Sequence, residues 1–262
     1  MTADQRLAEI LKKVGRAKQH HAELVAKIVA FRNTNPFIID TKRDPVTRRL
    51  IYYLSSVREI PVELSLIAGD IFHNLRSALD HLAYQLLLVG AGTGNFHVAF
   101  PIGDDQADFT KKRPRLKGLR QDALDAIDNL QPYRGGNNKL WQLHELSKID
   151  KHRLLVTVGS AFRSLDIGAH GRHMAIEANP DLAAYPHLPL FLMAGDKLFP
   201  LKAGAELFID GPDAEPVPTM QFRFEICLSE PPIIDIASLA PMLADMITAV
   251  EKILTDFKPS LN

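Results

Sequence analysis

The chain has 262 residues, of which 46% are hydrophobic and 24% charged, values that are ordinary for a globular protein. Lysine and arginine together number 31, as do aspartate and glutamate, so the net charge gives no overall positive field for binding nucleic acid. Cys227 is the sole cysteine, which excludes an intrachain disulfide, and no apolar stretch approaches the ~20 residues that a membrane-spanning helix needs.

The first segment predicts one long helix over residues 3–31. Thr2 and Gln5 have the spacing of a capping box, and apolar residues then recur three or four positions apart. His21 falls on this apolar stripe, where a histidine is more often packed and hydrogen-bonded than a ligand. The segment has no apolar core typical of a secretory signal, so we expect a cytoplasmic protein without a membrane partner.

Two short segments rich in Ile, Tyr and Phe follow, at residues 37–41 and 49–56. Turn-forming residues at 42–45 separate them, and this arrangement predicts a β-hairpin. Pro61 then opens a helix that we expect to end near Val89, since proline is well tolerated in the first turn of a helix.

A dense basic run comes next, and we interpret it as a solvated loop. Its members are Lys111, Lys112, Arg113, Arg115, Lys117 and Arg120. Helices are predicted over residues 120–130 and from Asn137 or Asn138 to about Asp150, because an asparagine is a favourable N-cap.

After residue 151 the pattern changes to short β-like runs between glycine, proline and aspartate turns. The predicted strands cover residues 153–160, 173–178, 188–193, 205–209 and 220–228. Cys227 lies in the last of them and is expected to pack as a small apolar residue. A final helix is expected to begin after Ser238, which places Pro241 in its first turn.

These elements predict an α+β fold in a single domain over residues 1–262. We expect both terminal helices to pack with the central helix as one bundle, with the β-hairpin and an antiparallel sheet inserted or appended. The helical part is expected at about 1–31, 61–150 and 238–262. The β-rich part is expected at about 37–56 and 153–230.

The segment Gly69–Leu86 combines an apolar face with a dense cluster of polar and titratable side chains. At about 100° per residue, the apolar face carries Ile71, Leu75, Ala78, Leu79, Leu82 and Leu86. The opposite side carries a polar stripe of Asp70, Asn74, Ser77 and His81. His73 and Asp80 flank this stripe, and Arg76 lies at its edge.

Arg76 and His81 are the candidate catalytic residues. A histidine exchanges protons near neutral pH, and an arginine holds phosphate oxygens in a bidentate fork. This pair suits cleavage of an RNA phosphodiester without a metal or other cofactor, because the RNA 2′-hydroxyl supplies the nucleophile. Residues five positions apart lie about 140° apart around a helix, so we expect the two groups to meet most readily across a homodimer.

The pattern Arg76-x4-His81 on a helix of an α-bundle resembles the signature of the HEPN superfamily. The resemblance implies a metal-independent endoribonuclease, RNA as the substrate, and a dimer in which Arg76 and His81 of two protomers line one cleft. Ser77 follows Arg76, where members of that superfamily more often have Asn, Asp or His. The β-rich region also departs from the superfamily's minimal bundle.

Two longer segments are similar to a group of uncharacterised bacterial proteins. They are GD-x-x-HNLRSALDHL at Gly69–Leu82 and LQPY…LW-x-LHEL…DKHR at Leu130–Arg153. This resemblance implies no activity. Its second segment contributes His152 and Arg153, either as cations at a helix C-terminus or as members of a supporting cluster with Asp70, His73, Asn74, Ser77 and Asp80.

Three other interpretations remain open. The polar cluster can be a structural hydrogen-bond network without catalysis, or the chain can be a module that binds a nucleotide, RNA or a partner protein. A metal site is the third alternative, although the chain has no recognised ligand spacing and we expect no metal and no cofactor. Its candidate ligands are His73, His81, His144 and His152 with Asp70 or Asp80.

Overall fold

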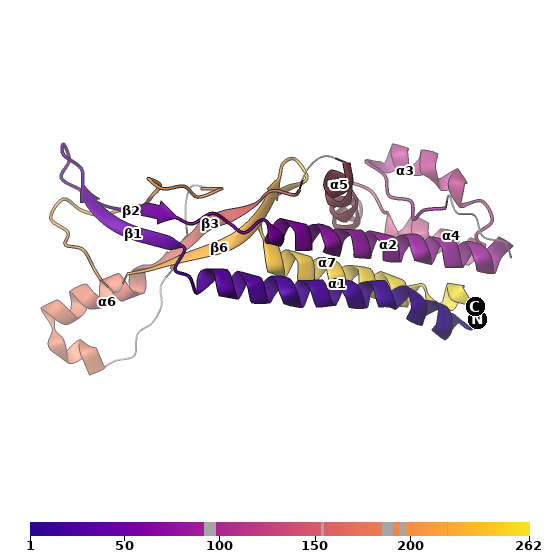
Figure 1. Ribbon diagram of the computed structural model, residues 1–262, viewed down its shortest axis with the longest axis horizontal. Helices are drawn as coiled ribbons and strands as arrows, with labels where there is room; N and C mark the ends of the chain where they lie inside the picture. Colours follow the sequence, from indigo (N-terminus) through magenta and orange to yellow (C-terminus); the bar gives the residue numbers. More distant parts are fainter. Residues whose placement is uncertain (92–97, 153–154, 185–190, 194–197, 219) are drawn as a thin grey trace. The chain divides into compact units, whose positions relative to one another are not determined.

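The computed structural model describes residues 1–91, 98–152, 155–184, 191–193, 198–218 and 220–262 (Figure 1). The chain folds into two compact units, each assembled from segments that are distant in the sequence. The α+β fold class is confirmed, because long helices occur together with antiparallel sheets. The helical unit comprises Met1–Lys27, Val62–Thr157 and Ser229–Asn262, and the sheet unit comprises Ile28–Pro61 and Val158–Leu228.

Three long helices form the centre of the helical unit: α1 (Ala3–Arg32), α2 (Glu63–Ala91) and α7 (Leu239–Asp256). They lie side by side in Figure 1, and Arg6 of α1 donates a hydrogen bond to Gln85 of α2. The predicted packing of both terminal helices with the central helix is therefore confirmed. The predicted apolar face of α2 is buried throughout, at Ile71, Leu75, Ala78, Leu79, Leu82 and Leu86.

Polar contacts support the start and the interior of α1. The Thr2 backbone N–H donates to Gln5 Oε1 at 2.9 Å, and the Gln5 N–H donates to Thr2 Oγ1 at 3.3 Å, so the predicted capping box is present. His21 is partly buried, and its Nε2 lies 2.9 Å from the carbonyl oxygen of Ala240 in α7. His21 is thus a packed and hydrogen-bonded residue, as its position on the apolar stripe predicts.

Shorter helices complete the helical unit. The predicted helices near 120–130 and 138–150 are confirmed as α4 (Gln121–Leu130) and α5 (Asn138–His152). No helix in the described part of the chain is both long enough and apolar enough to span a membrane. The shorter elements are α3 (Gln106–Lys112), the 3₁₀ helix η1 (Arg113–Leu116), α4 (Gln121–Leu130), α5 (Asn138–His152) and the 3₁₀ helix η3 (Lys258–Leu261).

The prediction of a loop for the basic run is wrong, because α3 and η1 occupy most of it. The Asp105 side chain caps α3 by accepting a hydrogen bond from the Asp108 N–H at 2.7 Å. Phe109 and Leu116 are buried and anchor the two short helices to the unit. These apolar anchors are too few among so many charges to produce a helical period in the sequence.

The sheet unit contains a three-stranded antiparallel sheet of β1 (Phe37–Arg43), β2 (Leu50–Val57) and β5 (Glu206–Ile209). The strand order is β1-β2-β5. The pairing of β1 with β2 confirms the predicted hairpin, and it begins with Phe37 opposite Val57.

The second sheet has the strand order β4-β3-β6-β7. Its strands are β3 (Val158–Asp166), β4 (Phe191–Met193), β6 (Gln221–Glu230) and β7 (Ile234–Ser238). Cys227 on β6 is fully buried, which confirms the prediction that it packs as a small apolar residue.

Several predictions for the second half of the chain are wrong. Residues 173–178 form the end of helix α6 (Ile167–Ala178) rather than a strand, because Met, Ala and Glu favour a helix. A 3₁₀ helix, η2 (Pro180–Ala184), follows α6. The strand predicted from residue 153 begins only at Val158, and β7 was not predicted. Of the predicted strands, residues 153–154 and 188–190 lie outside the described residues.

Candidate functional site

The side chain of Arg76 is buried in the helical unit, with only 8% of its surface exposed. Its Nη2 donates to the carbonyl oxygen of Phe100 at 2.8 Å and lies 3.0 Å from Asp80 Oδ1. The same Asp80 oxygen accepts a hydrogen bond from the Phe100 N–H at 2.9 Å. Asp80 is one turn along α2 from Arg76, so the two side chains and the Phe100 backbone form a closed group that fixes the guanidinium.

The second terminal nitrogen of Arg76, Nη1, is buried and has no hydrogen-bond partner among the described residues. Buried donors without partners are rare in folded proteins. Burial lowers the pKa of Arg76, while the Asp80 carboxylate acts in the opposite direction. Arg76 lines a cavity of about 170 Å³, together with Ala99, Phe100, Pro101, Ile102, Lys112, Arg115 and His144. We call this the Arg76 cavity.

Two further cations reach the Arg76 cavity from α3 and η1. Lys112 donates to the carbonyl oxygen of Ile102 at 2.8 Å and pairs with Asp108 at 2.7 Å. Arg115 is exposed and forms no ion pair with another described residue. The positive charges of Arg76 and Lys112 are each close to one carboxylate, whereas no carboxylate of the described residues pairs with Arg115.

The histidine of this site is His144, on α5. Burial is the main reason that the pKa of His144 falls to about 3, and the neighbouring charges of Arg76, Lys148, Lys112 and Lys151 lower it further. The imidazole is therefore neutral at pH 7. A neutral imidazole donates through one ring nitrogen and accepts through the other.

The predicted catalytic pair is not brought together within one chain. Arg76 lines the cavity, whereas His81 is exposed and is not one of the residues around it. Asn74 is buried, and its Nδ2 donates to the Asp70 carbonyl oxygen at 2.8 Å, within α2. Ser77 is partly buried.

Asp70 and His73 belong to a second group, which lies where α5 passes α2. Asp150 of α5 packs so closely against Gly69 that a β-carbon at residue 69 would lie 2.1 Å from Asp150 Oδ1. Burial raises the pKa of Asp150, as does the nearby Asp70, while His73 lowers it. The polar cluster predicted on α2 is thus divided between the Arg76 cavity and this crossing.

The remaining predicted site residues lie at the end of α5. His152 is exposed, and Arg153 lies outside the described residues. Within the described ranges, no group of three or more His, Cys, Asp or Glu is arranged to hold a metal ion. The alternative ligand set of His73, His81, His144 and His152 is therefore not assembled.

Sequence reasoning did not assign Lys112, Arg115 or His144 to the site of Arg76. The two cations belong to the basic run, for which the sequence predicts a loop, and His144 is predicted only as an alternative metal ligand. These three residues come together because α3, η1 and α5 pack around α2. No spacing in the sequence predicts this packing.

The chain was compared with known proteins at three levels. No protein-family model matches it, and no match was found among curated proteins or among solved structures. The geometry of the site must therefore carry the functional argument.

Proposed function

We propose that the helical unit binds a phosphate group in the Arg76 cavity. The observation that carries this proposal is Nη1 of Arg76, a buried and charged donor without a partner among the described residues, on a residue that lines a cavity. Leaving such a donor unpaired costs about 1–3 kcal/mol, and more when the group is charged. A phosphate oxygen would remove this cost by accepting a charge-assisted hydrogen bond.

The other groups around the cavity favour a phosphate over a carboxylate. Arg76, Lys112, Arg115 and His144 approach from α2, α3, η1 and α5 and can donate to several oxygens of one ligand. A phosphate offers three or more acceptor oxygens in different directions, whereas a carboxylate offers two in one plane. The unbalanced charge of Arg115 adds attraction for a dianion.

The size of the Arg76 cavity limits what it can enclose. Its volume of about 170 Å³ is below the ~300–1,000 Å³ of pockets that enclose drug-sized ligands. One phosphate group is a suitable occupant, and the rest of a nucleotide or an RNA chain would extend outside. Lys111 and Lys117 of the same basic run are exposed and can contact such an extension.

Isothermal titration with inorganic phosphate, at constant ionic strength, tests this proposal. Arg115→Gln is expected to weaken phosphate binding because it removes the unbalanced charge at the cavity. Lys117→Gln is the matched control, since Lys117 is exposed in the same run but does not line the cavity. Absence of binding by the wild-type protein, or equal effects of the two substitutions, would contradict the proposal.

A metal-independent ribonuclease of the HEPN type, acting in the cytoplasm as a homodimer, is the second candidate. It is favoured by two features: Arg76, although buried, lines a cavity, and His81 is exposed and available to a second copy of the chain. In this proposal the Arg76 cavity holds the scissile phosphate. His81 of the other protomer accepts the proton of the RNA 2′-hydroxyl as that oxygen attacks the phosphorus.

The ribonuclease is tested by RNA cleavage in the presence of EDTA, together with the mass of the particle by light scattering. Arg76→Ala and His81→Ala are expected to abolish cleavage while the proteins stay folded. If both substitutions lower only the melting temperature and no variant cleaves RNA, the polar cluster is structural. If phosphate binds without RNA cleavage, the site is a binding module.

A further inference from the structure

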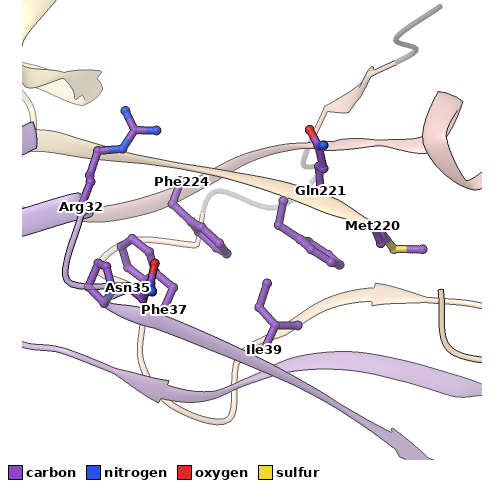
Figure 2. Close-up of a pocket in the computed structure, with 9 residues that line it drawn as sticks. Arg32, Asn35, Phe37, Ile39, Met220, Gln221 and Phe224 are labelled. Carbon is purple, nitrogen blue, oxygen red and sulfur yellow. The ribbon is translucent and has the colours of Figure 1, made fainter. Parts of the chain in front are cut away.

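A larger cavity, of about 420 Å³, lies within the sheet unit between β1 and β6 (Figure 2). Phe37 and Ile39 of β1 form one side, and Phe222 and Phe224 of β6 form the other. Alternate residues of a strand point to the same face. Phe37 and Ile39 therefore share one face of β1, Phe222 and Phe224 share one face of β6, and both faces are turned toward the interior of the unit. We call this the aromatic cavity.

The walls of the aromatic cavity are aromatic and only partly covered. The rings of Phe37 and Phe224 are stacked, with centroids 4.4 Å apart and an interplanar angle of 29°. Phe222 and Phe224 each pack against Phe162, at 6.0 and 5.9 Å between centroids. Phe37, Phe222 and Phe224 pack against the buried core of the sheet unit, and each stays partly accessible.

The edge of the aromatic cavity is polar and carries a positive charge. Arg32, at the end of α1, is exposed and forms no ion pair with a described residue. Asn35 and Gln221 also line the cavity and are exposed; in Figure 2 Asn35 lies beside Phe37, whereas Gln221 points away from the side of β6 that carries Phe224. Arg223 on β6 is not part of the lining, and its guanidinium carbon lies 3.9 Å from the centroid of the Phe191 ring.

We propose that the aromatic cavity binds a small aromatic anion, with its ring between β1 and β6 and its charged group at Arg32. The volume is within the range of pockets that enclose small organic ligands. Phenylalanine faces stack on a flat ring with an energy beyond that of apolar burial alone. Arg32 and the amide of Asn35 supply donors for a carboxylate or sulfonate. This site belongs to the sheet unit and does not depend on the Arg76 cavity.

The proposal is tested with two fluorescent probes that share an N-phenylnaphthylamine skeleton. One is the anion 8-anilino-1-naphthalenesulfonate, and the other is the uncharged N-phenyl-1-naphthylamine. The wild-type chain is expected to bind one equivalent of each. Arg32→Gln is expected to weaken binding of the anion about fivefold and leave the neutral probe unchanged, as for a partly exposed ion pair. Arg16→Gln, an exposed arginine on the same helix, is the control and should change neither.

A second pair of variants tests the apolar part of the cavity. Ile39→Trp fills the space and is expected to abolish binding of both probes while the circular dichroism spectrum stays native. Ile38→Trp is the matched control, because Ile38 is the adjacent and exposed residue on the opposite face of β1. It should leave both affinities unchanged.

The proposal is overturned if the wild-type protein binds neither probe at one equivalent. It is also overturned if Arg32→Gln weakens both probes equally or has no effect, or if Ile39→Trp retains binding. Displacement of the anionic probe by inorganic phosphate that is lost in Arg115→Gln would place that probe in the Arg76 cavity and would equally contradict it.

Discussion

Arg76 and Asp80 lie one turn apart on α2, with Arg76 Nη2 3.0 Å from Asp80 Oδ1. The same carboxylate oxygen also accepts the N–H of Phe100, whose carbonyl oxygen accepts from Arg76. This arrangement fixes one side of the guanidinium to the protein, and Nη1 is buried without a hydrogen-bond partner among the described residues. It is both a structural contact and the basis of the proposed phosphate site.

Asp80→Asn should destabilise the fold because it removes the charge that faces a buried guanidinium. The Asp80 side chain is 34% exposed, so we expect a loss of about 1–2 kcal/mol in the free energy of unfolding, less than for a fully buried pair. Urea unfolding measures the loss. Asp256→Asn removes an exposed pair with Lys252 at the same helical spacing and should cost less than ~0.5 kcal/mol. Equal losses of unfolding free energy in the two variants would show that the Arg76–Asp80 pair stabilises the fold no more than an exposed pair.

Lowering the pH should destabilise the protein through His144. Its pKa in the folded state, about 3, is below the 6.5 of an unperturbed histidine. Between these values the unfolded chain binds the proton and the folded chain does not, so stability is complete above pH 6.5 and is lost as the pH falls toward 3. The slope from this one group approaches ~1.4 kcal/mol per pH unit.

Urea unfolding of the wild-type protein and of His144→Gln at pH 7 and pH 5 tests this dependence. His144→Gln is expected to lose less stability between the two pH values than the wild-type protein. His152→Gln, an exposed histidine on the same helix, is the control and should behave as the wild type. An unchanged pH dependence in His144→Gln would mean that His144 titrates normally.

Two glycines in long helices should respond in opposite ways to alanine. A β-carbon at Gly90 would lie 2.2 Å from the carbonyl oxygen of Gly118, and this backbone cannot easily move aside. Gly90→Ala should therefore destabilise the protein by about 1–3 kcal/mol. Gly15 has open space around its α-carbon within α1, so Gly15→Ala should stabilise it by up to ~1 kcal/mol. Thermal unfolding of the two variants would contradict this packing if both melting temperatures rose.

Cys227 should be almost unreactive in the folded protein. Burial raises the pKa of its thiol to about 11, although Arg163 lies close to the sulfur and acts in the opposite direction. The thiolate is the reacting species, so little of it exists at pH 8. Iodoacetamide should label Cys227 slowly in buffer and rapidly in urea, as followed by mass spectrometry. Equal rates in the two conditions would mean that this part of β6 is accessible.

The helices with a regular apolar period were predictable from sequence. The stripe of α1, its Thr2–Gln5 cap and the apolar face of α2 all follow from local spacing, as does the start of α7 after Ser238. The α3 helix was missed because its buried residue, Phe109, lies among charges. Residues 173–178 were assigned to a strand although their composition favours the helix that forms.

The candidate site was only partly predictable. The chemistry of Arg76 indicates a site residue, but its hydrogen bond to the carbonyl oxygen of Phe100 joins positions 24 residues apart in the chain. His144 and Arg115 join it through tertiary packing alone. The spacing of Arg76 and His81 predicts His81 as the catalytic histidine, but His81 is exposed. The histidine that lines the cavity is His144, which belongs to α5.

The most direct test of the phosphate site is an NMR titration of the protein labelled with ¹⁵N in its arginine side chains. We expect the guanidinium signals of Arg76 to shift on addition of inorganic phosphate, with saturation, and to stay unchanged with chloride at equal ionic strength. If the Arg76 signals do not respond while the protein is folded, its buried Nη1 is not a ligand-binding donor and the proposed function is wrong.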